Sequence, residues 1–205
     1  MFHLPSFRRI TQTQEVDQFA AAYLQCSGFN VPREYYESNQ MLAIYWKGEM
    51  IGGFVLGAGS TLRTLEVFAG CEHRKTLYQK VENLGVPHTE MCCFWIKADC
   101  RKKTFLNFFV WLCVAFALRV YGSKQLIFGT NSARLAALYS AAPKSRLMHT
   151  DCLNQKRTFI FTGPRKDCLS GVVHILYYKA KRLLALQTSA NKPEFKMENR
   201  LSPAA

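Results

Sequence analysis

Residues 91–139 contain two predicted strands, with a basic segment and a long apolar helix between them. An apolar strand is predicted from Met91 to Lys97, and it runs directly into the basic segment Ala98–Thr104. A long apolar helix follows, and a second strand is predicted over Gln125–Phe128. The start of such a helix presents unpaired backbone N–H groups and the positive end of the helix dipole. The segment therefore has the chemistry of a phosphate-binding turn.

The order and spacing of this segment resemble the acyl-CoA-binding core of the GNAT superfamily of N-acyltransferases. The family's first signature reads roughly V-x-P-x-x-R-G-x-G-x-G/A, and Ile96, Ala98 and Arg101 stand at its Val, Pro and Arg positions. The glycines of that signature let the backbone approach a pyrophosphate closely. In this chain the glycine positions hold larger residues: Lys102, Thr104 and Leu106.

The second part of the resemblance is a strand followed by an Asn and by a helix that carries Leu-Tyr. Gln125–Phe128, Asn131 and Leu138-Tyr139 follow that order, with the Tyr one residue later than is usual. The resemblance implies that Asn131 lies near the pantetheine arm of the cofactor. It also implies that Tyr139 is the general acid that protonates the leaving thiolate. The residues alone are equally consistent with a helix N-cap at Asn131 and a packing residue at Tyr139.

The resemblance also implies residues for the cofactor phosphates and for the general base. Lysine and arginine charges of the basic turn would partly replace the missing glycine amides, because both side chains bind phosphate. Family members often place a Glu that works through water ahead of this turn, and Glu90 stands there, with Glu66 as the alternative base. A surface carboxylate is the other reading of each Glu, and a solvated loop is the other reading of the turn. The residues predicted to bind the cofactor are Arg101, Lys102, Lys103, Thr104 and Asn131.

The resemblance implies an α/β (α+β) fold, with a mixed and mostly antiparallel sheet of six to seven strands flanked by helices. The implied function is transfer of an acyl group from acyl-CoA, or from acyl carrier protein, to an amine acceptor. The cosubstrate would be acyl-CoA or CoA, with no metal. The alternative is a catalytically degenerate GNAT-like domain that binds an anionic protein, nucleic acid or membrane surface through its basic face.

The charge of the chain indicates an anionic partner. Twenty-seven Lys and Arg against 14 Asp and Glu give a formal net charge of +13. CoA, the acidic acyl carrier proteins, nucleic acid and an acidic membrane surface all suit this charge, as does a merely soluble basic surface. Aromatic-interleaved basic motifs of the RRM type are absent, which disfavours nucleic acid.

The cysteines favour a reducing, cytoplasmic location. The eight cysteines have no even framework spacing, and Cys92-Cys93 lie side by side on a predicted strand. Neither CxxC nor HxxxH occurs, which argues against a zinc site. The apolar stretch Phe105–Val120 is short of the roughly 20 residues that span a bilayer. It is therefore predicted to be a core helix packed on the sheet.

Three regions are predicted along the chain. Residues 1–163 form the GNAT-like acyltransferase domain, with the mixed-charge insertion 61–89, in which a strand is predicted near Leu62 to Phe68. Residues 164–187 form a basic amphipathic helix, whose segment 169–186 would pack on the domain or make a peripheral contact with an anionic membrane. Residues 188–205 form a disordered tail.

Overall fold

The fold is built on one mixed sheet. The computed structural model describes residues 3–59, 61–66, 71–153, 155–174, 177 and 181. In the part of the chain it describes, seven strands lie in the order β1-β2-β3-β4-β5-β7-β6, and only β4 and β5 run parallel. The strands are β1 (Ser6–Arg9), β2 (Gln40–Trp46), β3 (Glu49–Gly57), β4 (His88–Ile96), β5 (Gln125–Thr130), β6 (Arg146–Leu153) and β7 (Lys156–Pro164). The predicted mostly antiparallel, mixed sheet is confirmed.

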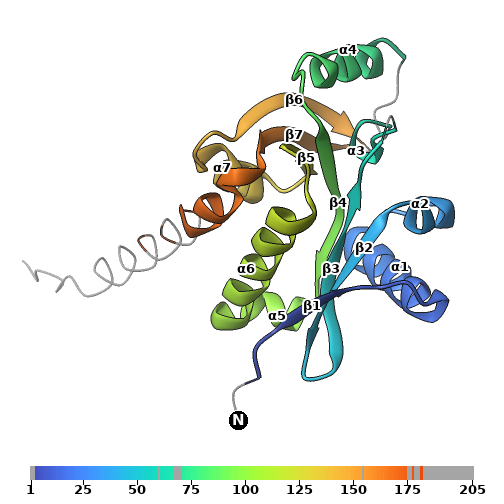
Figure 1. Cartoon of the computed structure of the whole chain (residues 1–205), viewed down its shortest axis with the longest axis vertical. Helices are drawn as coiled ribbons and strands as arrows, with labels where there is room; N and C mark the ends of the chain where they lie inside the picture. The colour runs from blue at the N-terminus through green and yellow to red at the C-terminus, as the bar shows by residue number, and fades with distance from the viewer. Residues whose placement is uncertain are drawn as a thin grey trace, which may run out of the picture.

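Helices cover both faces of the sheet (Figure 1). Successive side chains of β2 point to opposite faces, as the pleat of a strand requires. Leu42 and Ile44 pack with α6, whereas Met41 and Ala43 pack with α1 and α2. The helices are α1 (Thr13–Ser27), α2 (Arg33–Ser38), α3 (Arg63–Glu66), α4 (Cys71–Glu82), α5 (Ala98–Lys102), α6 (Thr104–Tyr121) and α7 (Ala133–Ala141).

Helix α6 packs on the sheet along one side only. Val110, Val114 and Ala117 are buried against the core, which confirms the predicted core helix. The opposite side of α6 exposes large apolar side chains, among them Phe116 and Val120, although the apolar sequence predicts burial all round. No helix in the described ranges is long and apolar enough to cross a membrane.

The insertion before β4 is helical where it is described. The predicted strand near Leu62 to Phe68 is wrong, because the amides of Leu65 and Glu66 both bond to the carbonyl of Leu62 and form the single turn α3. Leu62 and Leu65 are three residues apart, so one turn buries both against Leu77 of α4. Residues 67–70 lie outside the described residues.

The end of the described chain returns to the α6 side of the sheet. A short 3₁₀ helix, η1 (Arg165–Asp167), follows β7, and residues 168–174 are helical. The Arg165 guanidinium donates from Nη1 to the carbonyl of Gly122, at 2.7 Å, and ties this segment to the end of α6. The separation at 163/164 stays a prediction, and the predicted tail 188–205 lies outside the described residues.

Gly53 is required where β2, β3 and α1 meet. A Cβ added there would lie 2.5 Å from the Leu42 carbonyl oxygen and 2.6 Å from Cε2 of Phe19. Because one of these neighbours is backbone, relief requires movement of the sheet itself. We expect Gly53→Ala to lower the free energy of unfolding by about 1–3 kcal/mol, the usual cost of overpacking a core.

Urea denaturation of Gly53→Ala against wild type measures this effect. Gly59→Ala is the matched control, because a Cβ at Gly59 meets nothing within 4 Å. Equal stability of the two variants would contradict the close packing of β3 against β2.

Candidate active site

The centre of the sheet opens where β4 and β5 stop pairing. Their parallel pairing runs only from His88↔Gln125 to Met91↔Phe128. Beyond this point β4 continues beside β3, and β5 continues beside β7. A cleft of about 690 Å³ lies at this divergence, lined on the β4 side by residues 91–96 and on the β5 side by Gly129 and Thr130. The two strands therefore separate in the middle of a continuous sheet.

A bulge in β4 faces this cleft. Between the pairs Val55↔Cys92 and Gly53↔Trp95, β3 contributes one residue whereas β4 contributes two. Cys93, one of those two, has φ of 52°. Positive φ is uncommon outside glycine and is found preferentially at functional sites. A bulge leaves its extra residue outside the ladder, so its peptide groups are free to face a ligand such as a carbonyl oxygen.

The lining of the cleft is basic. Four cationic side chains reach it from separate parts of the chain, whereas no Asp, Glu or His is among its lining residues in the described part of the chain. Such a lining attracts phosphate or carboxylate groups. The four are Arg63, Arg101, Arg134 and Lys156.

Tyr139 lies in the cleft wall, on α7. Its side chain is 7% exposed, and its ring contacts Phe128 at 5.0 Å and Phe161 at 5.6 Å between centroids. Burial raises the pKa of Tyr139 above its ordinary value, so the hydroxyl keeps its proton at neutral pH. A buried, protonated phenol that touches the cleft is chemically suited to donate a proton there.

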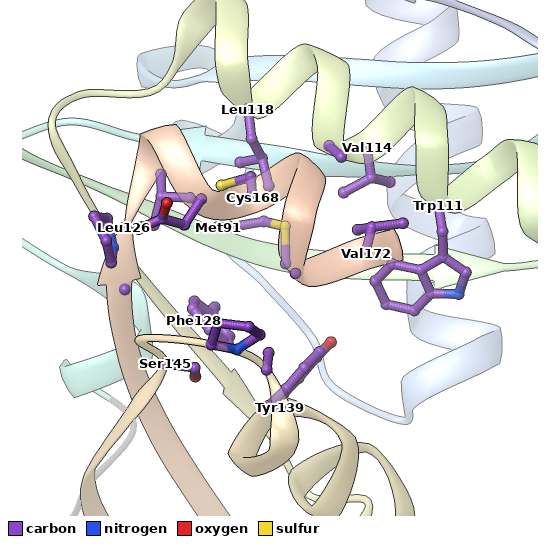
Figure 2. Close-up of a pocket in the computed structure, with 17 residues that line it drawn as sticks. Met91, Trp111, Val114, Leu118, Leu126, Phe128, Tyr139, Ser145, Cys168 and Val172 are labelled. Carbon is purple, nitrogen blue, oxygen red and sulfur yellow. The ribbon is translucent and has the colours of Figure 1, made fainter. Parts of the chain in front are cut away.

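A second, apolar pocket of about 90 Å³ adjoins the cleft. Met91, Trp111 and Tyr139 line both spaces, so the pocket lies next to the cleft, on the side of the sheet that α6 covers. Figure 2 shows Val114 and Leu118 of α6 on one side of the pocket and Cys168 and Val172 of the C-terminal segment beside them. An apolar space of this kind favours a hydrocarbon group over water.

Glu90 lies behind the cleft rather than in its lining. Its side chain is 0% exposed and accepts hydrogen bonds from the Tyr35 hydroxyl at 2.6 Å and from the Thr64 amide at 2.9 Å. Burial raises the pKa of Glu90, although both hydrogen bonds act in the opposite direction. The Tyr35 oxygen also lies 2.8 Å from Sγ of Cys92, which does line the cleft. Cys92 and Tyr35 thus connect Glu90 with the cleft.

The basic turn is partly helical and partly engaged with the protein. Its first residues form α5, and Arg101 donates from Nε to the Ile96 carbonyl oxygen at 2.6 Å while lining the cleft. The Lys103 ammonium lies 5.0 Å from the ring centroid of Trp46. Lys102 and Lys103 are exposed and do not line the cleft, and the side chain of Thr104 lies outside the described residues.

Asn131 lines the cleft beside the end of β5. It is not the N-cap of α7, because Ser132 takes that position and its side chain accepts from the Leu135 amide. Arg101, Asn131 and Tyr139 of the predicted residues therefore meet in one cleft.

Several residues of the site were not predicted from the sequence. Tyr35 and Thr64 contact Glu90 only because α2 and α3 fold back onto β4, and no local signal marks this contact. Arg134 offered a usable signal, since it opens the helix that follows the second strand. The alternative base Glu66 instead pairs with Arg74 at 3.0 Å and is outside the cleft lining.

Comparison with solved structures identifies the fold. FeeM, an N-acyl amino acid synthase from uncultured soil microbes, aligns over 83% of this chain and 96% of its own, with a TM-score of 0.60 and 10% identity. The acyl-homoserine lactone (AHL) synthase LasI aligns over 80% of this chain and 90% of its own, with a TM-score of 0.58 and 11% identity. The chain has a GNAT-like fold.

A third solved structure extends the comparison. BjaI, a CoA-dependent acyl-homoserine lactone synthase solved with MTA, aligns over 85% of this chain and 90% of its own. Its TM-score is 0.53 and its identity is 13%. No protein-family model matches the chain, and no curated protein matches it in sequence. The likeness is thus one of fold, over most of each chain.

The buried Glu90 predicts a pH dependence of stability. Because folding raises its pKa, the folded protein holds the Glu90 proton more tightly than the unfolded chain does. The free energy of unfolding is then highest below the ordinary pKa of 4.5 and falls as pH rises from there toward the raised value. Glu90→Gln has no such proton, so we expect this fall to disappear.

Denaturation midpoints between about pH 4 and 8 measure the Glu90 contribution. Glu82→Gln, at an exposed position on α4, is the matched control and should keep the wild-type profile. An unchanged profile in Glu90→Gln would mean that Glu90 is not held in a raised-pKa environment.

Proposed function

We propose that this protein is an N-acyltransferase that moves an acyl group from acyl-CoA, or from acyl carrier protein, to an amine. The observation that carries the proposal is the cleft at the β4–β5 divergence, which brings the buried phenol of Tyr139 and the bulge at Cys93 together with four basic side chains. A thioester carbonyl beside the bulge would meet hydrogen-bond donors, and the donor's phosphates would meet positive charge.

In the proposed reaction the amine nitrogen attacks the thioester carbonyl carbon directly. A C–N bond forms, the C–S bond breaks, the nitrogen loses one proton and the leaving sulfur gains one. Tyr139 gives its proton to the sulfur as the C–S bond breaks, and the buried phenol holds that proton at neutral pH. Glu90 accepts the amine proton through Cys92 and Tyr35, and its raised pKa makes it a stronger base than an exposed carboxylate.

The apolar pocket supports a donor whose acyl chain is longer than acetyl. The pocket adjoins the cleft at Met91, Trp111 and Tyr139, beside the place where the thioester would lie. A chain that enters it would exchange water for apolar contacts, which stabilises binding by about 0.8 kcal/mol for each buried CH₂. The structural neighbours include an N-acyl amino acid synthase and two AHL synthases, which supports an acyl-transfer function.

A specific observation favours a second candidate function. The positions of the family's phosphate-binding glycines hold Lys102, Thr104 and Leu106, and the turn contains the short helix α5. Side chains there crowd the close backbone approach that glycine permits. The second candidate is therefore a GNAT-like domain that binds an anionic partner without turnover.

Release of thiol from decanoyl-CoA, in the presence of a panel of amines that includes amino acids, tests the proposal. We expect amine-dependent release by wild type. In Tyr139→Phe we expect kcat to fall by about 10²-fold with little change in donor affinity, because the hydroxyl acts only as the C–S bond breaks. Tyr121→Phe, an exposed tyrosine at the end of α6, should retain wild-type kcat.

Two outcomes count against catalysis. An unchanged kcat in Tyr139→Phe would reduce Tyr139 to a packing residue. Donor binding without amine-dependent release from any donor would favour the second candidate function.

Chain-length preference tests the role of the pocket. A Cβ added at Gly171 finds its nearest neighbour, Cβ of Ala142, at 3.8 Å, so a larger side chain can enter the pocket there. We expect Gly171→Leu to lower kcat/KM for decanoyl-CoA at least about tenfold relative to acetyl-CoA, because it occupies the space of several methylene groups. Gly171→Ala is the control for the change in helix propensity. Equal losses for the two donors would contradict acyl-chain binding here.

A further inference from the structure

The outer side of α6 carries an apolar stripe. Residues 105, 109, 112, 116 and 120 follow the three- and four-residue spacing of one helix face, and all five are apolar. Phe105 and Phe116 are each 59% exposed and Val120 is 51% exposed, whereas Phe109 and Leu112 between them are half-buried. An 18-residue helix is about 27 Å long, and the stripe runs along most of it. Contiguous apolar surface of this extent on a protein usually marks an interaction site.

A second apolar row lies on the neighbouring segment. Leu169, Val173 and Tyr177 repeat every four residues and are all exposed. This segment lies on the same side of the sheet as α6 (Figure 1), and Arg165 ties its start to the end of α6. Cys168 and Val172 line the apolar pocket, so the row at Leu169 and Val173 belongs to a different side of this helix. We call the α6 stripe and this row together the apolar face.

The net positive charge of the protein comes from the part of the chain that contains this face. Residues 100–193 contain 16 Lys and Arg and two acidic residues, Asp151 and Asp167. All other residues together contain 11 Lys and Arg and 12 Asp and Glu. Asp167 lies 3.5 Å from Lys144, which offsets part of its charge. Exposed Arg101 and Lys102 lie in α5, just before α6, and exposed Arg119 lies near the end of α6.

This combination selects a lipid surface over a protein partner. A second copy of the chain would bring two strongly basic faces together, and such like-charge contact opposes association. An acidic protein surface suits the charge, but acidic groups do not cover large exposed phenylalanine side chains. An anionic bilayer supplies both requirements, because apolar side chains enter the acyl boundary while Lys and Arg contact headgroups.

We propose that the apolar face of α6 and the 169–177 row docks the protein on an anionic membrane surface. The helices lie in the plane of the interface and do not cross the bilayer. This attachment is independent of the proposed acyl transfer, since Phe116 and Val120 line neither the cleft nor the apolar pocket.

Flotation of the purified full chain with vesicles tests the proposal. We expect it to float with vesicles of 70% phosphatidylcholine and 30% phosphatidylglycerol, and to float less with phosphatidylcholine alone or in high salt. The double variant Phe116→Gln with Val120→Gln should bind the anionic vesicles at least about tenfold more weakly, because both side chains lose their favourable burial in the interface.

Leu24→Gln is the matched control, because Leu24 is exposed on α1, which packs on the other face of the sheet, and should float like wild type. Circular dichroism of each variant establishes that its fold is retained. A second variant, Val173→Gln, tests the 169–177 row without touching the contact of Phe116 with Phe7.

The proposal is overturned if wild type does not float with anionic vesicles, or if the α6 double variant and Leu24→Gln bind equally well. Sedimentation that shows a dimer of wild type, lost in the α6 double variant, would instead assign the face to a second copy of the chain. Retention by an acidic acyl carrier protein with no flotation would assign it to a protein partner.

Discussion

The interruption of one hydrogen-bonded ladder determines the architecture of this protein. β4 and β5 are the only parallel neighbours among the described strands, and their pairing stops at Met91↔Phe128. Backbone N–H and C=O groups beyond that point must find other partners, water or a ligand. The sheet stays continuous because β3 and β7 hold the two diverging strands from outside. The cleft, the bulge at Cys93 and the position of Tyr139 all depend on this divergence.

Much of the fold was predictable because its signals are local. The apolar periodicity of residues 91–128 predicts the strand–helix–strand unit. The prediction of a strand near Leu62 to Phe68 was wrong for a local reason. Leu62 and Leu65 are buried together by a single helical turn, and in the sequence such a turn looks the same as a short apolar strand.

The site was predictable only in part, for a physical reason. Arg101, Asn131 and Tyr139 stand at fixed offsets from the two strands, so the strands place them in the cleft. The environment of Glu90 depends instead on Tyr35 and Thr64, 55 and 26 residues away along the chain. The outer side of α6 escaped prediction because apolar sequence alone does not tell a side that meets the core from a side that meets another surface.

The net charge is divided unequally along the sequence. The buried carboxylate of Glu90 has hydrogen-bond partners on α2 and α3, whereas the net positive charge lies in the half of the sequence that begins at Cys100. Both the cleft and the apolar face draw on that charge. The same long helix thus lines the apolar pocket with its inner side and presents an apolar stripe with its outer side.

The central claim is that an acyl thioester binds between the diverging ends of β4 and β5. Hydrogen–deuterium exchange with and without saturating decanoyl-CoA tests it most directly, because the amides at the divergence have no strand partner between them. The account predicts slowed exchange in residues 92–96 and 129–132, together with the apolar pocket around Val172. Slowed exchange confined to other parts of the chain, or no change at saturating ligand, would contradict it.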